Sequence, residues 1–354
     1  MSNHTADLFN TERSTTPPFN DSSTIMATSI STVLHTNELD VIAANDMTSR
    51  ANYVYSFLAG LGFIAGCFLL YSFIQTYRAQ RRLAWLDCLL WAYCGLQMLL
   101  LLLSLHAVAY RPGYLRTTGL GCAILSFNIN AISLCSLLVL VLVAHVLTLD
   151  PPSHALLRKP RICVALVTLT SILISVLLAG LRGPCHGLQE ESTCFMDLVS
   201  AGVLYPATRL CLVFLIPYIV QLGLLIGGCF RQWKSKGRFL SGSEEGPMFL
   251  TVTVVVFFCQ LFYSVVLVRG AQLGKEELSP HERAFVSVAE FVLFSGSSTS
   301  LLLVLLMHRP FRESLYGALR QLRDCCRSPG RTQPNRNIIA PHIEITDTLQ
   351  DIES

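Results

Sequence analysis

The sequence predicts an all-α membrane protein: a seven-transmembrane-helix bundle with a short amphipathic helix after the last span. Three observations lead to this prediction. Hydrophobic residues make up 52% of the 354 residues and charged residues only 14%, a balance that is extreme for a soluble protein. Seven long runs contain few or no charged side chains. An arginine-rich segment with helical periodicity follows the seventh run.

The third run shows the pattern most plainly. It extends from Thr117 to Leu149 without any Lys, Arg, Asp or Glu. About 20 apolar residues, each rising about 1.5 Å in a helix, cross the hydrocarbon core of a bilayer. Asn128 and Asn130 lie in its first half, and amide groups in hydrocarbon need hydrogen-bonding partners. This face is therefore expected to contact other helices or a cavity, which places the span in a bundle.

The other six runs have similar lengths, close to what a tilted spanning helix needs. They are Asn52–Tyr77, Ala84–Ala109, Ile162–Leu181, Thr208–Phe230, Met248–Val268 and Arg283–Met307. Together the seven spans define a bundle domain of residues 51–307. Pro217 lies in the middle of the fifth span, where it is expected to kink the helix because proline cannot donate a backbone hydrogen bond.

The orientation follows from Lys and Arg in the short loops, because these residues accumulate on the cytosolic side. With the N-terminus outside, the loops after spans one, three and five and the segment after span seven are cytosolic, and they carry most of these cations. Residues 1–50 are rich in Ser, Thr, Asn and Asp and are expected to form a disordered extracellular tail. Its sequons make Asn3 and Asn20 candidate glycosylation sites, as expected for a plasma-membrane protein.

The segment after the seventh span is expected to hold two elements, a membrane-surface helix over residues 308–324 and a disordered cytoplasmic tail over residues 325–354. The apolar residues at helical spacing in the first element are Phe311, Leu315, Ala318, Leu319 and Leu322. Cys325 and Cys326 follow directly and are candidates for S-palmitoylation, with two reduced cysteines as the alternative. Bilayer lipid is therefore an expected partner of this region.

Several classes of function find no support in the sequence. No CxxC pair or HExxH run is present, so neither a metal site nor a cofactor is expected. No nucleophile–base pair is apparent, which argues against an enzyme, and no basic face indicates nucleic acid. A retinal protein needs a Schiff-base lysine, and no span contains one. A transporter is disfavoured, because Glu290 is nearly the only charge at depth and seven spans do not divide into equal repeats.

Glu290 lies about two turns into the seventh span, where an acid is costly and indicates either a functional site or a structural ion pair. Arginines near the outer ends of spans five, six and seven are candidate partners: Arg209, Arg269 and Arg283. Polar groups in the spans either line an outer cavity or join helices by hydrogen bonds. The candidate ligand-binding residues are Glu290, Arg209, Asn128, Asn130 and His106.

Taken together, these features resemble a class A (rhodopsin-like) G-protein-coupled receptor. The features are the seven spans, the sequons, a Cys near the start of span three, a Cys in the second outer loop, the proline of span five and the Phe-Arg-containing helix after span seven. The resemblance covers about residues 50–325. It implies a receptor that binds an extracellular ligand in the outer half of the bundle and couples to a heterotrimeric G protein or arrestin. It also implies a Cys122–Cys194 disulfide, with Cys185–Cys194 as the alternative pairing.

Four family motifs are changed in this chain. The Asp-Arg-Tyr position reads Ala144-His145-Val146 or Val146-Leu147-Thr148, and the Cys-Trp-x-Pro position reads Cys259-Gln260-Leu261-Phe262. The Asn-Pro-x-x-Tyr position begins at Ser300, and Gly95 takes the place of the acid of helix two. The candidate switch or motif positions are His145, Gln260 and Ser300 in these motifs, together with Pro217 of the fifth span.

Within the family, the chain resembles atypical orphan receptors that carry a His in place of the switch arginine. The changed motifs also allow a second interpretation, a receptor-shaped protein that does not signal and acts as a decoy, a scavenger or a partner of another receptor. An amine ligand is disfavoured, because no acid lies in the first half of span three. Arginines at the outer ends of the spans favour an acidic ligand instead: Arg182, Arg209, Arg269 and Arg283.

Overall fold

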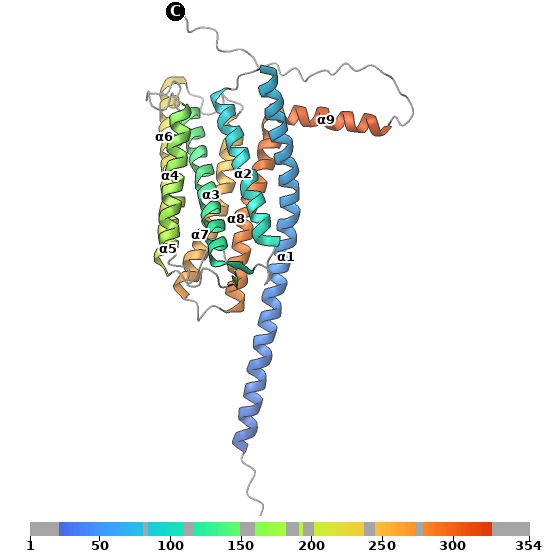
Figure 1. Cartoon of the computed structure of the whole chain (residues 1–354), viewed down its shortest axis with the longest axis vertical. Coiled ribbons are helices and arrows are strands. Elements are labelled where there is room, and N and C mark those ends of the chain that lie inside the picture. The colour runs from blue at the N-terminus through green and yellow to red at the C-terminus, as the bar shows by residue number, and fades with distance from the viewer. Residues whose placement is uncertain are drawn as a thin grey trace, which may run out of the picture.

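Seven helices that are long and apolar enough to cross a membrane form the body of the protein (Figure 1). The structure is a computed structural model that describes residues 21–80, 84–109, 116–148, 160–181, 191–193, 202–236, 245–273 and 279–327. Six spans are single helices: α1 (Asp21–Gln80), α2 (Trp85–Ala109), α3 (Gly119–Thr148), α4 (Pro160–Leu181), α7 (Gly246–Leu273) and α8 (Pro280–Met307). The expected seven-helix bundle is confirmed, and the chain is a multi-pass membrane protein.

The two ends of the bundle are distinguished by α1 and by α9 (Arg309–Arg327). The N-terminal part of α1 projects well beyond one end, here named the α1 end, whereas α9 lies crosswise at the opposite end, the α9 end (Figure 1). Phe311 in the first turn of α9 is buried, and its ring meets the ring of Phe73 of α1 edge-on at 4.7 Å. Tyr316 and Leu319 remain exposed, as suits a helix that rests on a membrane surface.

The structure differs from the expected disordered tail over residues 21–50. Helix α1 begins at Asp21 rather than at Asn52, so that this part of the tail is helical. Extending an existing helix requires no new nucleation, and the segment contains neither Gly nor Pro. An ion pair between Asp46 and Arg50 at 2.9 Å joins successive turns and adds local support. Residues 1–20, including Asn3 and Asn20, lie outside the described residues.

A short antiparallel sheet at the start of α3 adds to the helical architecture. Strand β1 (Arg116–Thr118) pairs with β2 (Glu191–Thr193), with Arg116 opposite Thr193. This pairing anchors part of the α4–α5 connection beside the N-terminus of α3. The sequence gives no strong signal for it, because three-residue strands are too short to show an alternating pattern.

The fifth span is divided into α5 (Leu204–Arg209), a π-helical segment η2 (Leu210–Leu215) and α6 (Ile216–Lys236). Pro217 is the second residue of α6. Its missing N–H and its ring would disturb a regular helix at the carbonyl of Val213, four residues earlier. The change in backbone geometry expected at Pro217 therefore takes the form of a π segment in the preceding turns.

Helix α8 is the most buried span and α4 the least, so α8 lies at the centre of the packing. It packs against α1, α2 and α7. Small residues permit close approach: an added Cβ at Gly62 of α1 would lie 2.7 Å from the Cα of Ser298 in α8. Large apolar side chains on the outside of the spans remain exposed, where lipid would cover them.

Candidate functional site

Arg209, the last residue of α5, is the centre of a buried polar cluster that joins three spans. Its side chain is only 2% exposed. Its Nε donates a hydrogen bond to Oδ1 of Asn130 in α3 at 3.2 Å, and Nδ2 of Asn130 donates to the hydroxyl of Tyr205 at 3.5 Å. The guanidinium also lies over the ring of Tyr263 in α7, 4.6 Å from its centroid. We refer to Asn130, Tyr205, Arg209 and Tyr263 as the arginine cluster.

Glu290 is a second buried charge in the bundle, 4% exposed on α8. Of the three arginines expected as its partner, Arg269 and Arg283 are exposed, and Arg209 alone is buried to a similar degree. A charge taken out of water is strongly destabilising unless an opposite charge or hydrogen bonds compensate it. Of the three arginines, Arg209 thus remains the candidate partner of Glu290 by burial.

The structure brings together only some of the candidate ligand-binding residues. Asn130 joins the arginine cluster, whereas Asn128 is partly exposed and donates to the carbonyl of Ile124 in its own helix at 2.9 Å. Two residues along a helix correspond to about 200°, so these two amides point to different faces. His106 belongs to α2, but its side chain lies outside the described part of the structure.

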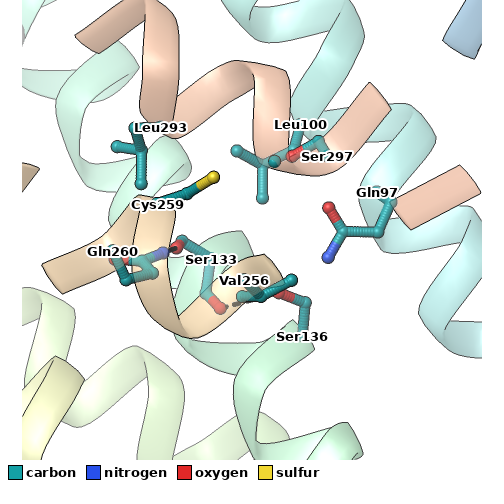
Figure 2. A pocket seen from close by; sticks show the side chains of 10 residues that line it. Gln97, Leu100, Ser133, Ser136, Val256, Cys259, Gln260, Leu293 and Ser297 are labelled. Carbon is teal, nitrogen blue, oxygen red and sulfur yellow. Dashed lines mark hydrogen bonds between the residues drawn. The ribbon is translucent and has the colours of Figure 1, made fainter. Parts of the chain in front are cut away.

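A small polar cavity lies deeper in the bundle, with walls from four spans (Figure 2). Its polar lining consists of Gln97, Ser133, Ser136, Cys259, Gln260 and Ser297. Nε2 of Gln260 donates to Oγ of Ser133 at 3.2 Å, which links α7 to α3, while the amide of Gln97 faces the same space from α2. The cavity measures about 20 Å³, which is room for one water molecule and far below the volume of a ligand pocket.

The four expected switch positions have different surroundings. Gln260 is buried and bonded across to Ser133, so its amide is an interhelical contact. Ser300 is also buried, but its hydroxyl donates to the carbonyl of Gly296 within α8 at 2.7 Å. His145 is half-buried in the last turn of α3, and Pro217 is buried next to the π segment. Of these four positions, Gln260 is the one whose side-chain hydrogen bond joins α7 to α3.

A second polar group at the α9 end was not foreseen from the sequence. Asp87 of α2, Glu245 just before α7 and His308 at the C-terminus of α8 place their nearest side-chain donor atoms within 4.8 Å of one another. Nε2 of His308 lies 3.6 Å from Oε1 of Glu245, and the imidazole contacts Phe311 of α9 with ring centroids 4.6 Å apart. We name these three residues the clasp. One imidazole and two carboxylates also form a donor set that can hold a divalent cation.

The clasp gives no local signal in the sequence, because its members come from three segments and each is an ordinary polar residue at a span end. The sequence offered one indication of such a group: Asp87 is an acid near the start of an otherwise apolar span. His308 is 7% exposed, and its imidazole lies beside the two carboxylates of Asp87 and Glu245.

A ligand-sized cavity lies at the α1 end, between α1, α7 and α8. Its volume is about 320 Å³. We name it the rim cleft; it is lined by Met47, Val266, Arg269, Gly270, Leu273, His281, Glu282, Phe285 and Val286. Of the rim arginines that the structure describes, Arg209, Arg269 and Arg283, only Arg269 contributes to its lining.

The proposed disulfide and palmitoylation sites are not tested by the structure. Cys185 and Cys194 lie outside the described residues, and the side chain of Cys122 does too. Cys194 follows Thr193 of β2, and Thr193 pairs with Arg116, six residues before Cys122. Cys325 and Cys326 are part of α9, but their side chains are likewise not described.

The chain was also compared with known proteins. No family model matches it, and no curated protein matches it either. Its classification therefore depends on its own residues: a seven-span membrane protein with a buried arginine cluster towards the α1 end and a clasp at the α9 end.

Proposed function

We propose that this chain is a plasma-membrane receptor of the rhodopsin-like G-protein-coupled type. In this proposal the α1 end is extracellular and the α9 end is cytosolic, as the distribution of Lys and Arg in the loops indicates. An acidic extracellular ligand binds towards the α1 end, and a heterotrimeric G protein or arrestin binds at the α9 end. The ligand acts by shifting an equilibrium between two arrangements of the helices.

The observation that carries this proposal is that α7 takes part in the polar contacts at both levels. Tyr263 and Gln260 connect α7 to Arg209 and Ser133, while Glu245, directly before its first residue, belongs to the clasp. Helix α7 has 28 residues and is about 42 Å long at 1.5 Å per residue. A tilt of this helix would therefore change the contacts of the arginine cluster and of the clasp together.

Two features favour such a tilt. The π segment Leu210–Leu215 interrupts the regular hydrogen bonding of the fifth span immediately after Arg209, and π segments recur at functional sites. Gln221 of α6 donates to the hydroxyl of Thr253 in α7 at 3.0 Å. The two helices are therefore joined on the α9 side of this interruption. Opening of the clasp would then expose a surface between α2, α7 and α8 for a transducer.

The proposal is tested by expressing the full chain with a surface tag and measuring constitutive G-protein activation and β-arrestin recruitment. The variant His308→Ala removes the clasp imidazole, and Arg312→Ala in exposed α9 is the matched control. A receptor is expected to give more basal signal with His308→Ala than with the control. Silence of all three proteins in both assays, at normal surface delivery, would instead favour a receptor-shaped protein that does not signal.

A further inference from the structure

The rim cleft has the dimensions of a binding site but sits at the edge of the bundle. Its volume of about 320 Å³ is within the range of small-molecule pockets, about 300–1,000 Å³. Its walls come from α1, the C-terminal end of α7 and the first turns of α8. Met47 belongs to the part of α1 that the sequence did not predict to be helical, and it is the contribution of α1 to the lining of the cleft.

The lining divides into an apolar wall and a polar edge. The apolar part consists of Met47, Val266, Leu273, Phe285 and Val286. Arg269 and His281 supply the polar edge; both are exposed, and Arg269 has no ion-pair partner among the residues that the structure describes. A charge beside an apolar wall favours a ligand that carries an opposite charge and a hydrocarbon part.

The one acid in the lining, Glu282, is engaged in capping α8. Its Oε2 accepts hydrogen bonds from the backbone N–H of Ser279 at 3.2 Å and from the hydroxyl of Ser279 at 3.3 Å. The Ser279 hydroxyl in turn accepts from the N–H of Glu282, which completes a capping box. This carboxylate is thus partly compensated by the helix N-terminus, and Arg269 determines the sign of charge that the cleft prefers.

The cleft also borders the lipid-facing side of the bundle. Phe285, which lines it, is 42% exposed and meets Phe262 edge-on at 5.7 Å, and the neighbouring Val265 is 55% exposed. Arg269 directly follows the apolar run of α7, where a cation lies at the level of lipid head groups. An amphiphile could therefore enter sideways from the bilayer, with its head at Arg269 and its chain along Phe262 and Val265.

We propose that the rim cleft binds a single-chain amphiphile with an anionic head, a carboxylate or a phosphate. The volume corresponds to about ten water molecules at about 30 Å³ each, enough for a head group and the first methylenes. The remainder of the chain lies in the outer leaflet against the exposed apolar side chains. The inference rests on the proposed function for its orientation, because the cleft opens to the outer leaflet only if the α1 end is extracellular.

The test uses the full chain in phosphatidylcholine nanodiscs and a long-chain fatty acid that carries a photoreactive group. The expected result is crosslinking to α7 and α8 residues of the cleft. Unlabelled fatty acid and a lysophosphatidate compete, and their relative potency separates a carboxylate ligand from a phosphate one. A monoacylglycerol of equal chain length competes at least about tenfold more weakly, because it lacks the charge. Acetate and inorganic phosphate do not compete.

Two variants of neighbouring arginines make the test specific. Arg269→Gln is expected to weaken binding of the anionic probe about tenfold, while binding of the neutral lipid stays the same. Arg283→Gln, an exposed arginine outside the cleft lining, is the matched control and leaves both unchanged. Val286→Trp fills the cleft and should reduce binding of both lipids. Equal competition by the neutral lipid, or unchanged binding by Arg269→Gln, would refute the inference.

The crosslinking test measures binding and does not depend on signalling. Failure of the cleft proposal and failure of the receptor proposal can therefore be distinguished. Specific crosslinking together with silence in the transducer assays would overturn the receptor proposal alone. Constitutive signalling that responds to His308→Ala, together with no specific crosslinking, would overturn the cleft proposal alone.

Discussion

The close packing of α1 on α8 makes a quantitative prediction about glycines of α1. An alanine Cβ at Gly62 would lie 2.7 Å from both the Cα and the Cβ of Ser298, whereas ordinary contacts begin at 3.4 Å. Because one of these atoms belongs to the backbone, no change of rotamer relieves the overlap. The two helices must separate by about 0.7 Å, the difference between these distances, along one of the main interfaces of the bundle.

Two other glycines of the same helix provide matched controls. An alanine at Gly60 meets no atom within 4 Å, and an alanine at Gly66 meets chiefly the flexible side chain of Met98. All three substitutions gain the same intrinsic helix propensity, about 1 kcal/mol. Overpacking against backbone costs about 1–3 kcal/mol, so Gly62→Ala should be less stable than Gly60→Ala by about this amount. Gly66→Ala should lie between them, because Met98 can move aside.

The assay is the apparent melting temperature of each purified variant in the same detergent, with surface delivery in cells as a second measure. The expected order of stability is Gly60→Ala, then Gly66→Ala, then Gly62→Ala. If Gly62→Ala melted at or above the temperature of Gly60→Ala, the close contact between α1 and α8 would not exist in the folded protein, and this reasoning would be refuted.

Three further predictions follow from the buried charges and from the topology. Arg209→Met and Glu290→Gln should each lower the free energy of unfolding by about 3–5 kcal/mol, and the double variant should lower it by less than the sum of the two. Additive shifts of the melting temperature would show that these charges do not compensate each other. Glu245→Gln and His308→Ala should each raise basal G-protein activation by up to about tenfold, the result of an equilibrium shift of about 1.4 kcal/mol; unchanged activity at equal surface level would exclude the clasp as a restraint. Replacing both sequon asparagines with Gln should abolish a glycosidase-sensitive mass shift, and a wild-type protein without any such shift would contradict an extracellular N-terminus.

The spans were predictable because lipid imposes a simple rule. Every backbone polar group must be satisfied within the segment, so a spanning helix appears in the sequence as a run of apolar residues of fixed length. The run Ile162–Leu181 corresponds to the observed span, and Arg283–Met307 differs from α8 only in its first residues. The amphipathic periodicity after His308 likewise predicted α9, which begins at Arg309.

Two local features could not be predicted from composition, because they depend on the adjoining helix or on the packing of neighbouring helices. The polar segment before Asn52 has the composition of a disordered tail, yet it continues the helix of the first span from Asp21. A proline predicts a disturbance in the fifth span, but its form, a π segment over Leu210–Leu215, depends on how the neighbouring helices pack.

The candidate sites required the tertiary structure for a different reason: they are made from residues far apart in the sequence. The chain itself determined that Glu290 and Arg209 are rare charges within apolar spans. Only the packing of helices decided that Asn130 faces Arg209 while Asn128, two residues away, faces elsewhere. Side-chain direction on a helix rotates by about 100° per residue, and composition sets the number of spans but not the rotation of each about its axis.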